Sequence, residues 1–357
     1  MEIGIVGLPN VGKSTLFNAI TDAGAQSSNY PFTTIEPNVG VVPVPDKRLD
    51  ALFDIFKPDK KTPAFIKFVD IAGLVKGSSK GEGLGNKFLA NIREVDAIVH
   101  VIRCFKAEDV AHVMGDVDPI RDIEVIELEL VLADLESVTK MIEKNITAAR
   151  SGNKEARSRV ERLEIIKKKL SDGMPASQSG IKSEDMKEFN LLTSKPMIYL
   201  ANTDENPDKN LVKKLIDYAS KKGIDVVEVS AKIESEIIKL SESERKEFLK
   251  SMGVEYSGLE KLTISAMKLL DLITFFTVCS SKEVRAWNIK RGTKAPQAAG
   301  KIHSDFEKGF IKAEVYSFDD IIKYKDEKIL RERGLIRVEG KDYEVRDGDI
   351  CFFRFNI

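Results

Sequence analysis

The sequence predicts an α/β fold with an inserted pair of long helices and a small β-rich module at its C-terminal end. Three observations support this. A glycine-rich loop, Gly7 to Ser14, stands between an apolar strand and the start of a helix. Residues 121–190 carry apolar side chains at helical spacing, and from Phe276 the chain reads as short strands and turns. Alternation of strands and helices around such a loop is typical of α/β domains.

Composition and charge narrow the class of protein. The 357 residues are 42% hydrophobic and 32% charged, as in ordinary globular chains. The formal net charge is −1, which excludes polyanion binding by net charge but not by local patches. No run of 18 apolar residues occurs and no basic leader precedes the first strand, so we expect a cytoplasmic protein with no membrane span. The three cysteines are widely separated and are expected to be buried, reduced thiols, with a redox-sensing thiol as the alternative.

The glycine-rich loop matches the P-loop pattern Gly-x4-Gly-Lys-Ser. Its glycines allow backbone N–H groups to turn toward a β-phosphate, and the following helix adds positive potential at its N-terminus. We expect Lys13 to contact the β- and γ-phosphates and the Ser14 hydroxyl to bind Mg²⁺. The loop therefore predicts a Mg²⁺-dependent nucleoside triphosphate site, whose candidate nucleotide contacts here are Gly7, Pro9, Asn10, Val11, Gly12, Lys13, Ser14 and Thr15.

A second phosphate motif, Asp70-Ile71-Ala72-Gly73, follows the apolar strand expected at 65–69. Its aspartate can hold a water bound to Mg²⁺, and the glycine N–H can meet the γ-phosphate. Between the two motifs lie Thr33 and Thr34, either of which could place a hydroxyl on the metal and the γ-phosphate. The pattern alone does not choose between them. The candidate metal ligands are Ser14, Thr34 and Asp70.

The expected base-recognition motif departs from the guanine-specific pattern Asn-Lys-x-Asp. The apolar run 197–201 ends in Asn202-Thr203-Asp204-Glu205, with threonine at the lysine position and glutamate at the aspartate position. Glutamate is one methylene longer, so the two hydrogen bonds that select guanine should be misplaced, and ATP is favoured. An altered register that uses Asp204 would restore GTP. The expected base-side residues are Asn202, Glu205, Ser230, Ala231 and Lys232.

Several stretches resemble the YchF-type Obg-like ATPases, nearly end to end. They are GLPNVGKST, NYPFTTIEPNVG, DIAGLVKGSSKGEGLGNKFL, NTDE and RGTKAPQAAGKIHSDFEKGFIKAEV. The resemblance implies preference for ATP over GTP, slow hydrolysis and association with ribosomes. It also implies a nucleotide-binding domain of residues 1–120 and 191–275, an inserted helical arm of residues 121–190, and a TGS domain of β-grasp fold at 276–357.

The catalytic machinery departs from the Ras-like pattern. The residue after the Asp70–Gly73 motif is Leu74, where Ras-like enzymes place the glutamine that orients water. His112, in a loop-like stretch, is a candidate for that role, with an ordinary loop histidine as the alternative. Gly73 would sense the γ-phosphate. Related enzymes that use potassium hold the ion at the position of Asn10, so K⁺ is a second candidate cofactor.

The insert and the C-terminal module are the expected partner-binding parts. Apolar spacing predicts two antiparallel helices joined at residues 151–153, and residues 136–170 carry ten basic residues against five acidic ones. A solvated helix face explains this excess as well as RNA contact does, and the resemblance favours RNA phosphates. The resemblance implies the large ribosomal subunit and RNA as partners, bound by the helical arm and the TGS domain. The module, with 17 basic and 14 acidic residues from 276 on, should bind partners and end in a hairpin around Gly340 and Gly348.

The sequence thus predicts a monomeric, Mg²⁺-dependent ATPase switch whose nucleotide state changes how the arm and the C-terminal module dock on a partner. Two alternatives stay open. One is a true GTPase associated with translation. The other is a nucleotide-gated RNA-binding protein in which hydrolysis is incidental.

Overall fold

The structure is a computed structural model that describes residues 1–26, 38–71, 83–105, 116–279 and 282–356. The chain packs into two compact units. Unit 1 comprises Met1–Ile20, Glu36–Gly40 and Phe68–Gly258, and unit 2 comprises Thr21–Ile35, Val41–Lys67 and Leu259–Ile357. This division into two units follows from packing and does not test the three domains expected from the sequence, which remain a proposal.

A six-stranded sheet with the order β2-β4-β1-β5-β6-β7 carries the glycine-rich loop. Strands β1, β5, β6 and β7 pair in parallel, with Ile5 opposite Val99 and His100 opposite Tyr199. Every residue of β5 is buried, as expected for a strand with helices on both faces. The strands are β1 (Glu2–Val6), β2 (Val39–Pro43), β4 (Phe65–Asp70), β5 (Ala97–Arg103), β6 (Met197–Asn202) and β7 (Asp225–Val229).

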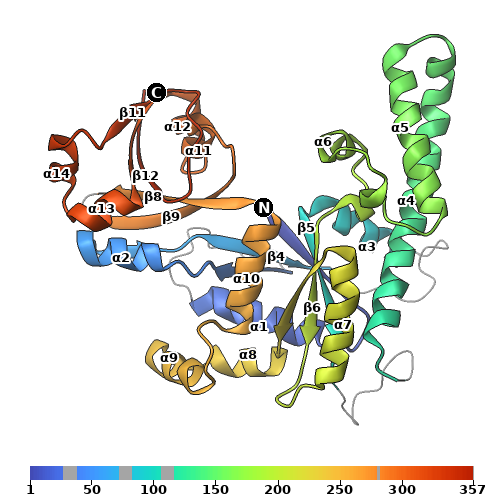
Figure 1. The fold of residues 1–357 in the computed structure, drawn as a ribbon, viewed down its shortest axis with the longest axis horizontal. Helices are drawn as coiled ribbons and strands as arrows, with labels where there is room; N and C mark the ends of the chain where they lie inside the picture. Colours follow the sequence, from blue (N-terminus) through green and yellow to red (C-terminus); the bar gives the residue numbers. More distant parts are fainter. Residues whose placement is uncertain (27–37, 72–82, 106–115, 280–281, 357) are drawn as a thin grey trace. The chain divides into compact units, whose positions relative to one another are not determined.

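Helices and short 3₁₀ turns connect these strands (Figure 1). Many begin at a polar cap, for example Asp118 before α4 and Asp208 before α7, each of which accepts hydrogen bonds from free backbone N–H groups of the first turn. The elements are α1 (Lys13–Gln26), α3 (Gly83–Glu94), α4 (Pro119–Arg150), α5 (Lys154–Ser171), η2 (Ala176–Gln178), α6 (Ser183–Met186), η3 (Lys187–Phe189), η4 (Leu192–Ser194), α7 (Lys209–Lys222), α8 (Ala231–Ile237), α9 (Glu242–Ser251) and α10 (Gly258–Leu269).

The expected antiparallel helix pair is confirmed. Helices α4 and α5 run side by side, and the turn between them places Gly152 at φ 95° and caps α5 with Asn153 (Figure 1). The seam buries the apolar residues whose spacing predicted the helices, including Val138, Ile142 and Leu163. Each fully buried side chain of this size contributes about 1.5–3 kcal/mol, which holds the pair together without a larger core.

Polar contacts from two residues of α4 hold its N-terminal half, one buried and made to η4, the other partly buried and made to β6. The Asp134 carboxylate accepts hydrogen bonds from the N–H groups of Leu192 and Thr193, at 3.0 and 2.8 Å, and from the Thr193 hydroxyl at 2.7 Å. On β6, the Tyr199 hydroxyl donates to Glu127 Oε1 of α4 at 2.6 Å. Because buried polar groups are costly to leave without partners, these contacts fix the register of α4.

Unit 2 contains a second six-stranded sheet, with the order β11-β10-β12-β8-β9-β3. Its central pair, β12 and β8, is parallel, while β8–β9 and β10–β12 are antiparallel. This order, with helix α11 across one face, is the β-grasp arrangement expected from the sequence. The strands are β3 (Lys60–Thr62), β8 (Leu272–Cys279), β9 (Glu283–Lys290), β10 (Phe310–Ser317), β11 (Arg337–Glu339) and β12 (Asp349–Phe355).

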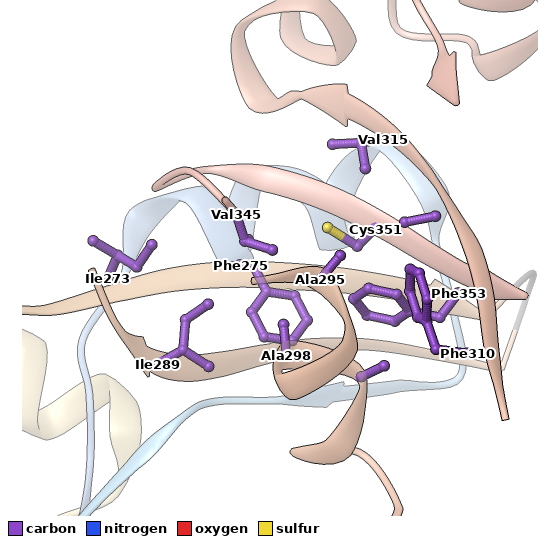
Figure 2. Packing of buried hydrophobic residues seen from close by; sticks show 12 residues of the cluster. Ile273, Phe275, Ile289, Ala295, Ala298, Phe310, Val315, Val345, Cys351 and Phe353 are labelled. Carbon is purple, nitrogen blue, oxygen red and sulfur yellow. The ribbon is translucent and has the colours of Figure 1, made fainter. Parts of the chain in front are cut away.

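The core of unit 2 forms between this sheet and α11 (Figure 2). Phe275 lies at its centre, edge-on to Phe353 at a ring distance of 5.9 Å. The alanines of α11, Ala295, Ala298 and Ala299, are fully buried and allow the helix to approach the strands closely. The helices of unit 2 include α2 (Lys47–Phe56), α10 from Leu259 on, α11 (Ala295–Gly300), α12 (Ser304–Lys308), α13 (Phe318–Tyr324) and α14 (Glu327–Glu332).

Two sequence-based expectations need correction. The expectation of a terminal hairpin around Gly340 and Gly348 is wrong. Strands β11 and β12 do not pair with each other, because β10 lies between them in the sheet. Cys104 and Cys351 are buried as expected, and burial raises the pKa of the Cys104 thiol to about 12, but Cys279 is exposed. None of the helices described is long and apolar enough to cross a membrane.

Candidate nucleotide-binding site

The site motifs lie at one edge of the sheet in unit 1. In a parallel sheet the carboxyl ends of the strands share an edge, and α/β proteins bind ligands there. The glycine-rich loop follows β1, Arg103 ends β5, Asn202 ends β6, and Ser230 follows β7. Topology therefore gathers motifs that are up to about 220 residues apart in the chain.

The conformation of the loop requires its two glycines. A Cβ atom on Gly7 would come within 2.8 Å of the Val101 carbonyl oxygen and 2.9 Å of Val11 Cγ2. Gly12 has φ 89°, and a Cβ there would collide with the side-chain amide of Asn202. Asn10 also has positive φ, 65°, which asparagine tolerates better than most residues. The backbone is thus shaped as a P-loop requires for phosphate binding.

Lys13 and Asp70 face each other across the site. The Lys13 ammonium forms an ion pair with Asp70 Oδ1, and both side chains are largely buried. Lys13 is the first residue of α1, and Asp70 is the last residue of β4. The two groups that the motifs assign to phosphate and to metal therefore lie within direct contact of each other.

Asn202 connects the base-side motif to the glycine-rich loop. Its Nδ2 donates a 2.8 Å hydrogen bond to the Val11 carbonyl, and its Oδ1 accepts one of 3.1 Å from the Ala231 N–H. The side chain is only 3% exposed. Asn202 was expected to contact the base. In the structure both ends of its amide are hydrogen-bonded to the protein backbone, so Asn202 joins the glycine-rich loop to the loop that begins at Ser230.

The two acidic candidates beside Asn202 differ in environment. Glu205 is exposed and forms a 2.8 Å ion pair with Lys232, and this hydrogen bond holds the pKa of the glutamate below its usual value. Asp204 is only partly exposed, and its Oδ1 has no hydrogen-bond partner among the described residues. The structure brings Glu205 and Lys232 together, as the sequence implied, and leaves Asp204 as a second carboxylate next to them.

The loop that leads from β7 into α8 is held by the helix cap of α8. Ser230 precedes α8, and its side chain accepts a hydrogen bond from the Ile233 N–H at 3.4 Å. Ala231 is buried. In α8, Glu234 is almost completely buried and accepts a hydrogen bond from the Gly258 N–H at 2.7 Å. These contacts give the loop a fixed backbone beside Asn202.

The oxygen donors present suit Mg²⁺. Ser14 is exposed in the first turn of α1, and Asp70 supplies a carboxylate at the end of β4. The described residues contain no group of three or more His, Cys, Asp or Glu that could hold a metal. Mg²⁺ commonly binds through one or two protein oxygens together with substrate phosphates and waters, so this donor set fits it. Thr33, Thr34, Gly73, Leu74 and His112 lie outside the described residues.

A buried guanidinium at this edge of the sheet was not expected from the sequence. Arg103 is 1% exposed, pairs in register with Asn202, and donates from Nε to the Phe105 carbonyl at 3.1 Å. Burial lowers its pKa, and the buried Asp122 carboxylate of α4 opposes that shift. The sequence did carry a signal, because Arg103 ends an apolar strand. A charged residue that is buried with such a strand requires partners.

Comparisons with known proteins agree with this geometry. A family model described as 50S ribosome-binding GTPase matches residues 2–132. A model for the C-terminal domain of YchF GTPases, described as a protein of unknown function, matches residues 272–356. The chain is 51% identical to a protein of Haemophilus influenzae named ribosome-binding ATPase YchF, over all of this chain and 99% of that one. A Bacillus subtilis protein of the same name is 50% identical over the full length of both.

A solved structure shows the same fold over the whole chain. The structure of the Schizosaccharomyces pombe YchF GTPase has a TM-score of 0.89 and 38% identity, and the match covers 99% of this chain and 97% of that one. The names of these relatives differ on the nucleotide, since the bacterial proteins are called ATPases and the yeast protein a GTPase.

Proposed function

The chain belongs to the YchF family, and we propose that it is a Mg²⁺-dependent ATPase that associates with ribosomes. One observation carries the proposal. Lys13 and Asp70 meet at a glycine-rich loop that Asn202 ties to the base-side motif. Phosphate-binding and base-binding groups are thereby held in one rigid arrangement, as catalysis by positioning requires.

Each protein group has a role in this proposal. The backbone N–H groups of the glycine-rich loop bind the β-phosphate, and Lys13 leaves Asp70 to contact the β- and γ-phosphates. Ser14 and Asp70, with Thr34, would hold Mg²⁺, which would neutralise charge that develops on the phosphates. Gly73 would donate its N–H to the γ-phosphate. The Lys13–Asp70 ion pair keeps both groups in place when nucleotide leaves.

The base-side geometry supports ATP as the substrate. A guanine-specific site needs a carboxylate that accepts two hydrogen bonds from the base. Here Glu205 is longer than aspartate and is paired with Lys232. Its carboxylate is therefore not placed to accept both hydrogen bonds from guanine. Adenine has no N1–H and does not need it. Ser230 and Ala231 supply backbone groups beside the base, and Asn202 positions them.

Water activation must come from a group other than the residue at 74, because leucine cannot orient water by hydrogen bonding. His112 is the proposed positioning group. Asn10, whose backbone has positive φ in the glycine-rich loop, is the proposed ligand of K⁺. Transfer of the γ-phosphoryl group to water would then depend on orientation and on charge neutralisation, with no covalent protein intermediate.

The ribosome association rests on the names of the relatives and of the family model, and the large subunit is the partner that the latter implies. On the arm, Lys144, Arg150 and Lys154 lie near the turn and have no ionic partner among the described residues. In contrast, Arg162, which lies farther from the turn in the middle of α5, is paired with Asp185 and Glu188. Cations without protein partners are available for RNA phosphates. We place the protein in the cytoplasm as a monomer.

A turnover assay tests the proposal. ATP hydrolysis should require Mg²⁺, and Lys13→Ala should reduce kcat by about 10²–10³-fold, as expected when one fixed charge donor is lost. The matched control is Lys221→Ala, a change of an exposed lysine in the last turn of α7, which leads into the start of β7 and so lies at the edge of the sheet opposite the site motifs. Equal ATP turnover by wild type and Lys13→Ala would contradict the proposal.

A further inference from the structure

Strands β2 and β4 are neighbours in the first sheet and form a two-stranded ribbon. At one end the Asp70 N–H donates to the Asn38 carbonyl at 2.9 Å, and at the other the Val44 N–H donates to the Ala64 carbonyl at 2.8 Å, so the strands run antiparallel. Asp70 is a proposed metal ligand, and the chain before Asn38 contains Thr34, which lies outside the described residues. One end of the ribbon therefore belongs to the proposed Mg²⁺ site.

The connection at the far end of the ribbon belongs to unit 2. Residues 45–63 contain α2 and β3, and packing places residues 41–67 in unit 2 together with the C-terminal part of the chain. Strand β3 is the edge strand of the second sheet and pairs in parallel with β9, with Thr62 opposite Arg285. Helix α2 packs on the same strand (Figure 1). A segment that lies between two proposed metal ligands in the chain thus completes the sheet of the C-terminal module.

Arg48, near the start of α2, attaches this connection to the C-terminal strands. Its guanidinium forms 2.8 Å ion pairs with Asp46 and with Asp347, and lies 5.3 Å from the centre of the Phe276 ring of β8. Burial alone would lower the pKa of Arg48, but the hydrogen bonds to the two carboxylates raise it above its ordinary value. An arginine that binds two carboxylates in a fixed fork geometry holds both of them in place.

The Asp347 carboxylate is itself held by the sheet. Its Oδ1 accepts a 2.8 Å hydrogen bond from the Thr274 N–H of β8, and the Gly348 N–H donates to the Thr274 carbonyl at 2.8 Å. Gly348 has φ 85°, and a Cβ there would lie 3.4 Å from Nη1 of Arg48. The turn that leads into β12 therefore presents Asp347 to Arg48 in a defined position.

A second attachment is buried. Thr62 of β3 is fully buried, and its hydroxyl donates a hydrogen bond to Glu283 of β9. The Asp50–Lys61 ion pair, in contrast, joins α2 to β3 within the connection, and both of its side chains are exposed. Exposed pairs of this kind contribute little. Arg48 and Thr62 are therefore the side chains that fix the connection to the C-terminal strands.

We propose that unit 2 helps to position the metal ligands of the nucleotide site through this ribbon, and that Arg48 and Asp347 are positioning residues for Mg²⁺. Breaking a ladder hydrogen bond leaves backbone groups without partners, so the ribbon moves as one piece. A shift of α2 and β3 therefore moves Asp70. The proposal rests on the Mg²⁺-dependent ATP site proposed above and adds the C-terminal module to it.

One consequence concerns the partner of the C-terminal module. If the sheet of unit 2 and the Mg²⁺ site are linked, a partner that shifts β9 or the turn before β12 changes the affinity for Mg²⁺ with ATP. By linkage, Mg²⁺ with ATP changes the affinity for that partner by the same factor.

The test measures the affinity of the full chain for adenylyl imidodiphosphate, a non-hydrolysable ATP analogue, by titration calorimetry with Mg²⁺ and with EDTA in its place. Arg48→Met and Asp347→Asn should each weaken binding with Mg²⁺ by about 5- to 20-fold, within the range usual for coupled sites, and leave the affinity in EDTA unchanged. Asparagine retains an acceptor for the Thr274 N–H, so Asp347→Asn removes mainly the charge. General loss of structure would lower both affinities together.

Hydrogen exchange gives a second readout that needs no hydrolysis. In wild type, Mg²⁺ with the analogue should slow amide exchange in β3 and β9. Thr62→Val removes the hydroxyl that binds Glu283 and retains a side chain of similar shape, so the slowing in β9 should be lost while the glycine-rich loop stays protected. Equal slowing of β9 in wild type and Thr62→Val would count against the link.

Two controls match these variants. Arg291→Met removes an exposed ion pair with Asp271 in unit 2, and Asp50→Asn removes the exposed pair within the connection. Neither should change the affinity with Mg²⁺. The proposal is overturned if Arg48→Met and Asp347→Asn bind the analogue with Mg²⁺ as tightly as wild type does.

Failures of the two proposals are distinguishable. Wild type that binds the analogue equally well with Mg²⁺ and with EDTA would contradict the Mg²⁺-dependent site, and the positioning role with it. Wild type that requires Mg²⁺, with the same requirement in both variants, would contradict the positioning role alone.

Discussion

Asn202 donates a hydrogen bond to the backbone carbonyl of Val11, 191 positions earlier in the chain. Because the same amide also accepts from Ala231, a single buried side chain joins the glycine-rich loop to the last base-side loop. We therefore expect the affinity for phosphate and the choice of base to be coupled through Asn202.

Asn202→Ala should weaken ATP binding by at least about tenfold and lower the free energy of unfolding by about 1–3 kcal/mol, because the Ala231 N–H and the Val11 carbonyl lose their partner. Titration calorimetry and urea unfolding measure the two effects. The matched control is Asn210→Ala, which changes an exposed asparagine at the start of α7. An ATP affinity equal to that of wild type would mean that the loop keeps its shape without Asn202.

Asp70→Asn should raise the Mg²⁺ concentration for half-maximal ATP turnover by about 10- to 100-fold, the usual effect of losing a carboxylate that orients a metal-bound water. The measurement is turnover against Mg²⁺ at fixed ATP. Asp50→Asn, which changes an exposed carboxylate paired with Lys61, serves as the control and should leave the Mg²⁺ requirement unchanged. A Mg²⁺ requirement in Asp70→Asn equal to that of wild type would remove Asp70 from the metal site.

The base motif can be converted toward the guanine-specific pattern. Thr203→Lys with Glu205→Asp gives Asn-Lys-Asp-Asp, and the affinity ratio of GTP to ATP should rise by about tenfold or more, because the two guanine N–H donors regain an acceptor. Lys232→Ala alone removes the partner of Glu205 but does not shorten its side chain, and should leave the preference for ATP. Equal ratios in the double variant and wild type would show that Glu205 does not face the base.

His100 should make the protein sensitive to acid. It is 1% exposed, and burial, with Lys222 nearby, lowers its pKa to about 3 from the ordinary 6.5. The unfolded chain takes up a proton below about pH 6.5 that the folded chain refuses until about pH 3, so stability is present above pH 6.5 and is lost as the pH falls toward 3.

His100→Phe should remove this loss. Wild type should lose about 2 kcal/mol more than the variant in free energy of unfolding between pH 8 and pH 5. Urea unfolding at the two pH values measures the difference. His303→Asn changes an exposed histidine and retains a side chain that can cap α12, so it should behave as wild type. If His100→Phe and wild type lost the same stability between pH 8 and pH 5, His100 would not be the source of the acid sensitivity.

The sequence was sufficient for the parts of the fold in which local pattern and tertiary structure agree. The motif Gly7 to Ser14 predicted its strand, loop and helix because the positive φ of Gly12 and the close approach at Gly7 strongly favour glycine at these two positions. The spacing of Val138, Ile142 and Leu163 predicted the helix pair because its seam is local. Such features depend on short stretches of chain, which a single sequence displays.

The remainder depends on contacts distant in sequence. The side chain of Asn202 turns to the protein because Val11 and Ala231 meet it in space, and no local pattern shows that. Strand β10 enters between β11 and β12, which a sequence of turns and short strands does not reveal. The surroundings of Arg103 and the pairing of β3 with β9 likewise follow from how the sheets assemble.

We expect this P-loop site to bind adenine nucleotides more tightly than guanine nucleotides. Calorimetric titration of nucleotide-free protein with ATP and with GTP, both with Mg²⁺, tests it most directly. Binding of ATP at least about ten times tighter, or roughly 1.4 kcal/mol, is the predicted result. Tighter binding of GTP would contradict the account, and would identify Asp204 as the carboxylate that reads guanine.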